Sequence, residues 1–176
     1  MAVGLEGNQV FEIGSITKTF TASLLADMSA RGEVRLDDPV AKYLPPSVRV
    51  PSRNGKQITL VDLATQSSGL PRLPSNLAPR DRANPYADYS VDQLYAFLAG
   101  YELPRDVGVT YEYSNLGMGL LGHALALKAG TTYENLVSRR ILTPLGMRET
   151  TITLSPALRA RLAPGHDGEG KVVPNW

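Results

Sequence analysis

The chain carries a serine and a lysine three residues apart, Ser15 and Lys18, at the start of a predicted helix. Residues at this spacing lie on the same face of a helix, so the hydroxyl and the amine should be in contact. A serine hydroxyl is a weak nucleophile until a base takes its proton, and a lysine with a lowered pKa can act as that base. The pair therefore predicts nucleophilic catalysis. The alternative is that Ser15 caps the helix and Lys18 is a solvated charge.

A second polar group, Tyr113-Ser114-Asn115, lies far along the chain from this pair. A phenol can relay a proton, and an asparagine amide can orient a substrate amide or a lysine ammonium. The alternative is a junction between an extended segment and a helix, with Ser114 as the N-cap. The two interpretations are compatible with each other.

These groups must be positioned by a mainly α-helical fold with a few short strands. Helix signals, read from apolar periodicity and end residues, cover residues 15–31, 37–43, 59–67, 90–99, 114–128 and 131–142. Strand signals are confined to residues 10–13, 150–154 and 171–173, and residues 71–89 form a proline-containing loop.

Three of these helices begin with a capping-box pattern, in which a serine or threonine precedes an acid or amide by three residues. The pairs are Thr59 with Asp62, Ser90 with Gln93, and Thr131 with Glu134. Within residues 114–128, the glycines at 117, 119 and 122 are costly in a helix, so we expect them to allow close packing against a neighbouring helix.

Composition excludes several classes of function. The 176 residues suit one domain, and the net charge of +1 gives no reason to expect a nucleic-acid or anionic-membrane partner. No apolar stretch approaches the roughly 20 residues that span a bilayer. The absence of cysteine excludes disulfides and thiolate chemistry. No cluster of histidines and carboxylates has metal-ligand spacing and no glycine-rich phosphate loop is present, so neither a metal nor a cofactor is expected.

Several segments together resemble a known family. The segment from Phe11 to Ala22 reads FEIGSITKTFTA and is similar to the nucleophile region of class C serine β-lactamases and the related D-alanyl-D-alanine carboxypeptidases and esterases. Tyr111–Gly117 (YEYSNLG) resembles the tyrosine motif of that family. Thr59–Pro71 and Pro144–Met147 resemble further landmarks in the same order.

The resemblance implies a covalent serine mechanism acting on a small-molecule substrate. Ser15 would attack the carbonyl of a β-lactam, a D-Ala peptide or a small ester, and its main-chain N–H would help to hold the oxyanion. Lys18 and Tyr113 would share the proton transfers, and Asn115 would contact the substrate or Lys18. The sequence does not choose among the three substrate classes.

The third motif of the family, Lys-Thr-Gly or His-x-Gly on a strand, has no clear counterpart. Lys128-Ala129-Gly130 is expected to be a helix end with a C-cap glycine, and His166-Asp167-Gly168 is only a weak candidate. We therefore expect residues 1–176 to form a single β-lactamase-like domain that is incomplete at both ends and lacks most of the sheet.

Such a form is expected to have weak or no activity and to self-associate as a homo-oligomer through an exposed apolar face. The alternative is a non-catalytic helical module that binds a ligand or partner. The resemblance implies a periplasmic or secreted location, although Met1–Gly7 shows no signal-peptide pattern.

Overall fold

A computed structural model describes residues 7–176, and its architecture is mainly helical with few short strands, as expected. The pattern at Met1–Gly7 falls almost wholly outside the described residues. The helical elements are η1 (Gly14–Ile16), α1 (Thr17–Ala30), η2 (Val40–Tyr43), α2 (Leu60–Ala64), α3 (Val91–Gly100), α4 (Asn115–Lys128), α5 (Tyr133–Val137), the π-helical turn η3 (Ser138–Leu142) and α6 (Pro156–Arg159). The strands are β1 (Ser52–Arg53), β2 (Lys56–Gln57), β3 (Gly165–His166) and β4 (Val172–Val173).

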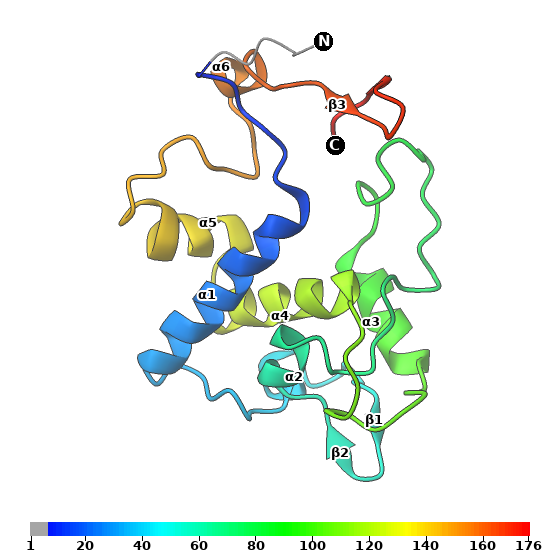
Figure 1. The fold of residues 1–176 in the computed structure, drawn as a ribbon. Coiled ribbons are helices and arrows are strands. Elements are labelled where there is room, and N and C mark those ends of the chain that lie inside the picture. Colours follow the sequence, from blue (N-terminus) through cyan, green and yellow to red (C-terminus); the bar gives the residue numbers. More distant parts are fainter. Residues whose placement is uncertain (1–6) are drawn as a thin grey trace.

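Helix α4 is the centre of the packing. It contacts α1, α2, α5 and η2, and Figure 1 shows α1 crossing it near the middle of the molecule. Leucine and alanine side chains cover most of its circumference, which is typical of a buried helix. Leu24 and Met28 of α1 are fully buried in the same core, and burial of such a side chain contributes about 1.5–3 kcal/mol. This packing fixes α1 against α4 and so sets the distance between the two predicted polar groups.

The glycines of α4 do not all serve close packing. A Cβ at position 122 would lie 3.1 Å from the ring of Tyr133, and one at position 117 would lie 3.2 Å from the hydroxyl of Ser114. A Cβ at position 119 would meet nothing within 4 Å. Close packing against a neighbouring helix therefore holds for Gly122, which faces Tyr133 of α5, and is wrong for Gly119. The tight contact at Gly117 is with the N-cap of α4 itself, and Leu63 of α2 would lie at an ordinary 3.5 Å.

The strands differ from the expectation in detail. Residues 150–154 form no strand, and within residues 10–13 only Val10 makes an isolated bridge, to Leu162. Val172–Val173 does form a strand, which pairs antiparallel with β3. The β1–β2 hairpin was not expected, although its turn, Asn54-Gly55, has the positive φ values of a tight hairpin turn.

Two of the three capping boxes are confirmed, at Thr59 with Asp62 and at Ser90 with Gln93. The third is wrong. Thr132, not Thr131, caps α5 through the amide of Asn135, and the carboxylate of Glu134 turns away to the loop of residues 151–153. There Glu134 accepts hydrogen bonds from the main-chain amides of Ile152 and Thr153, whereas in a capping box it would accept from a single amide.

Apolar side chains do reach the surface near the start of α1. Ile13 and Ile152 are exposed, Ile152 by 61%, and together with Phe20 they line one shallow apolar cavity. Self-association through this surface stays a prediction. Within residues 7–176, no helix is long and apolar enough to cross a membrane.

Candidate active site

Ser15 lies in the 3₁₀ turn that leads into α1. Gly14 allows the turn because it adopts a φ of +50°, in the region where other residues are strained. Helix α1 itself begins at Thr17, and its N-cap, Ile16, makes no side-chain capping bond. The interpretation of Ser15 as a helix cap is therefore wrong, and its hydroxyl is left for other contacts.

The hydroxyl of Ser15 accepts two hydrogen bonds from charged or ionisable groups. Lys18 Nζ donates to Ser15 Oγ at 3.1 Å, across one turn of backbone, as the spacing predicts. Tyr113 donates its phenol proton to the same oxygen at 2.6 Å. Both donors can carry a proton to or from Oγ without any side chain having to move.

Lys18 also connects the two helices. Its ammonium donates to Asn115 Oδ1 at 2.7 Å, and this contact joins the first turn of α1 to the first turn of α4. The amide oxygen orients the ammonium toward the hydroxyl of Ser15. The structure thus brings together all four predicted site residues: Ser15, Lys18, Tyr113 and Asn115.

Ser114 holds Tyr113 and Asn115 in place. It is 1% exposed, its hydroxyl donates to the carbonyl of Pro71 at 2.7 Å, and the same hydroxyl accepts from the amide of Gly117. It is the N-cap of α4, as predicted. A buried cap between two of the predicted site residues leaves little freedom for either of them.

Gln66 is a supporting residue that the sequence reasoning missed. Its side-chain oxygen accepts from the amide of Ser114 at 2.6 Å, and its carbonyl accepts from the amide of Glu112 at 2.7 Å. It adopts a φ of +62°, which is uncommon for a residue with a side chain. The polar turn after α2 could have indicated a tight bend, but its long-range contact with Ser114 has no local signal.

The electrostatic environment favours ionisation of Tyr113. Its pKa is lowered below the usual tyrosine value, first by the hydrogen bond with Lys18, then by that with Ser15, with attraction to the charges of Lys18 and Arg72 adding to the effect. Lys18 Nζ lies 4.7 Å from the centre of the Tyr113 ring. A phenol that ionises more readily is a candidate general base for a neighbouring serine hydroxyl.

The weaker candidates stay apart from this cluster. His166 lies in the two-residue strand β3, and none of the hydrogen bonds found within residues 7–176 joins its side chain to the four site residues. Gly130 follows the end of α4 with a φ of +63°, so Lys128-Ala129-Gly130 is a helix end, as predicted.

The chain is similar to known proteins over nearly its whole length. The sequence profile of the family described as Beta-lactamase matches residues 3–176. The chain belongs to the β-lactamase family. Its β-lactamase-family relatives include the D-alanyl-D-alanine-carboxypeptidase/endopeptidase AmpH of Escherichia coli K12, which is 40% identical over 88% of this chain. A β-lactamase of the same organism is 35% identical over 93% of this chain.

Solved structures of the β-lactamase family are similar over most of the chain. A β-lactamase/D-alanine carboxypeptidase from Yersinia pestis superimposes with a TM-score of 0.81 at 35% identity, over 89% of this chain and 46% of that one. A class C β-lactamase from Rhodobacter sphaeroides gives a TM-score of 0.74 at 34% identity, over 94% and 44%. The chain spans about two fifths of the length of the curated relatives it matches, 40% in both Escherichia coli proteins.

Proposed function

We propose that the chain is a serine hydrolase that acts through an acyl-enzyme on Ser15. The observation that carries the proposal is the hydroxyl of Ser15, which accepts hydrogen bonds from both Lys18 and Tyr113. A serine that only stabilises a helix end bonds main-chain amides instead. Membership of the β-lactamase family supports the same chemistry.

The proposed reaction begins with attack of Ser15 Oγ on the carbonyl carbon of the substrate. In the proposed reactive form Tyr113 has lost its proton, so the direction of the 2.6 Å contact is reversed and the hydroxyl of Ser15 donates to the phenolate oxygen. The proton of the hydroxyl passes to that oxygen as the new carbon–oxygen bond forms. The bond from that carbon to its nitrogen or oxygen leaving atom then breaks, and Tyr113 gives its proton to the leaving atom. Water hydrolyses the resulting ester of Ser15 by the same steps in reverse order.

Lys18 and Asn115 have supporting roles in this proposal. The ammonium stabilises the negative charge on the Tyr113 oxygen, and Asn115 keeps the ammonium directed at the pair through the 2.7 Å contact. The substrate is a β-lactam, a D-Ala peptide or a small ester. The names of the relatives, which include carboxypeptidases and β-lactamases, support the β-lactam and the D-Ala peptide, and the small ester rests on the resemblance of the motifs alone.

Intact mass spectrometry tests the proposal directly. The chain is incubated with nitrocefin, with an aryl ester such as p-nitrophenyl butyrate, or with a fluorophosphonate, and the mass is recorded over time. We expect the mass of one acyl or phosphonyl group to be added, and we expect Ser15→Ala to abolish the addition. Ser23→Ala, which removes an exposed hydroxyl from α1, the helix that follows Ser15, serves as the matched control. An unmodified wild-type chain, or equal modification of Ser15→Ala, would refute the proposal.

A further inference from the structure

A second cation lies beside Tyr113, and neither the sequence motifs nor the proposed reaction uses it. The guanidinium carbon of Arg72 is 5.0 Å from the centre of the Tyr113 ring. Arg72 is exposed, and it forms no ion pair with any carboxylate among residues 7–176. Its charge is therefore not neutralised by a protein partner and acts on the phenol.

The main chain of Arg72 is tied to the same site. Its carbonyl accepts from the amides of Asn115 at 3.1 Å and of Leu116 at 3.3 Å. These amides belong to the first turn of α4 and have no acceptor within the helix itself. The backbone at position 72 is thus fixed relative to Asn115, and the side chain extends from a fixed point toward Tyr113.

We propose, on the basis of the proposed function, that Arg72 is a positioning residue: its guanidinium packs over the Tyr113 ring and keeps the phenol oxygen on Ser15 Oγ. A planar guanidinium is well suited to the face of an aromatic ring, and this contact is worth more when the ring bears negative charge. The charged groups that face the ring are Lys18 and Arg72, and both favour the ionised phenol.

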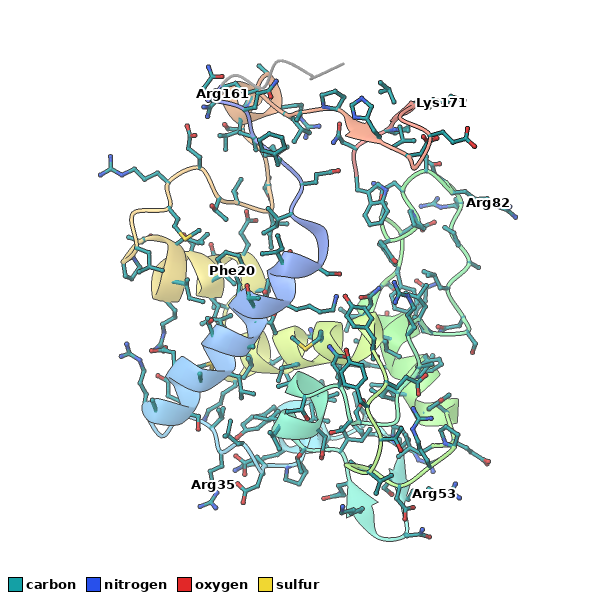
Figure 2. All side chains as sticks on the ribbon, viewed as in Figure 1. Phe20, Arg35, Arg53, Arg82, Arg161 and Lys171 are labelled. Carbon is teal, nitrogen blue, oxygen red and sulfur yellow. The ribbon has the colours of Figure 1, made fainter. Side chains whose placement is uncertain are left out.

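This geometry predicts that Arg72 acts through Tyr113 and not by holding the substrate. Arg72→Met keeps an unbranched apolar stem and removes the charge, whereas Arg72→Lys keeps a charge that can also lie over a ring. The carbonyl that binds the start of α4 is retained in both variants, so both are expected to fold. Arg82→Met is the matched control, because Arg82 is exposed and points outward from the loop of residues 71–89 (Figure 2).

The first experiment does not depend on activity. Ultraviolet difference titration of each protein against the same protein carrying Tyr113→Phe isolates the ionisation of the Tyr113 phenol. We expect Arg72→Met to move the midpoint to higher pH, Arg72→Lys to restore it toward wild type, and Arg82→Met to leave it unchanged. An unchanged midpoint in Arg72→Met overturns the proposal.

The second experiment is a double-mutant cycle on the acylation rate. Arg72→Met should lower the rate of Ser15 labelling about two- to fivefold and shift the rising limb of its pH profile upward. In a Tyr113→Phe background it should have no further effect. An equal loss in both backgrounds would show that Arg72 contacts the substrate, which also overturns the proposal. If the wild-type chain is not labelled at all, the proposed function fails, and the titration alone decides the role of Arg72.

Discussion

Replacement of Gln66 tests whether the turn after α2 holds the candidate site. In Gln66→Ala the amide of Ser114, in a residue that is only 1% exposed, loses its acceptor at 2.6 Å. A buried N–H without a partner costs about 1–3 kcal/mol. Gln66→Gly loses the same bond, but glycine adopts the φ of +62° without strain, which offsets about 1 kcal/mol of the loss.

Urea unfolding gives the free energy of unfolding of both variants, and thermal unfolding gives their Tm, each followed by circular dichroism. We expect the free energy of unfolding to fall in the order wild type, Gln66→Gly, Gln66→Ala, and each 1 kcal/mol to lower Tm by about 2–4 °C in a chain of this size. Gln57→Ala is the control, because Gln57 is exposed and its loss should change stability by less than about 0.5 kcal/mol. Stability of Gln66→Ala equal to wild type, or greater than that of Gln66→Gly, would refute the reasoning.

The same variants should also affect Ser15. Ser114 lies between Tyr113 and Asn115. When its amide loses the bond to Gln66, Tyr113 is held less firmly against Ser15 and Asn115 less firmly against Lys18. We expect Gln66→Ala to be labelled more slowly than wild type under conditions in which both are fully folded. Equal labelling would show that the turn stabilises the fold without positioning the site.

Two further predictions concern stability away from the site. The pKa of Glu134 is lowered from 4.5 to about 2, chiefly by the hydrogen bond from the amide of Thr153; its contribution to stability is therefore complete above about pH 4.5 and lost as the pH falls toward 2. Stability measured from pH 5 to 2 should fall less steeply in Glu134→Gln, and parallel profiles would contradict this assignment. Gly119→Ala should stabilise the chain by up to about 1 kcal/mol, because position 119 is open. Gly122→Ala should be about 1–3 kcal/mol less stable than Gly119→Ala, because its Cβ meets the ring of Tyr133, and equal thermal unfolding of the two variants would disprove the contact.

The contact between Ser15 and Lys18 could be predicted because it spans only three residues, from the 3₁₀ turn η1 into the first turn of α1. Tyr113 and Asn115 could be added through the resemblance of their motif to a family, since no local rule places a residue of α4 beside α1. The capping interactions at Thr59 and Ser90 were likewise local and were predicted correctly.

Other features depend on contacts between distant segments and could not be predicted. The contacts of Gln66 and Arg72 follow from the fold of the turn after α2 against the start of α4, and polar residues in a turn give no sign of such a partner. Glu134 fits the capping-box pattern, yet its carboxylate accepts hydrogen bonds from the amides of Ile152 and Thr153 in the loop at 151–153 and does not bond the helix start. The hairpin at Asn54-Gly55 is different, because Asn-Gly is itself a local turn signal in the sequence.

The four amides at the start of α4 are all occupied by the protein itself. The amides of Asn115 and Leu116 donate to the carbonyl of Arg72. The amide of Gly117 donates to the hydroxyl of Ser114, and the amide of Met118 donates to the carbonyl of Ser114. An incoming anion therefore finds no open amide at this helix end, so attraction there has to come from side-chain charges. Because these amides already have acceptors, the side chain of Asn115 is not needed to cap the helix. Its carboxamide oxygen can therefore accept the hydrogen bond from the Lys18 ammonium.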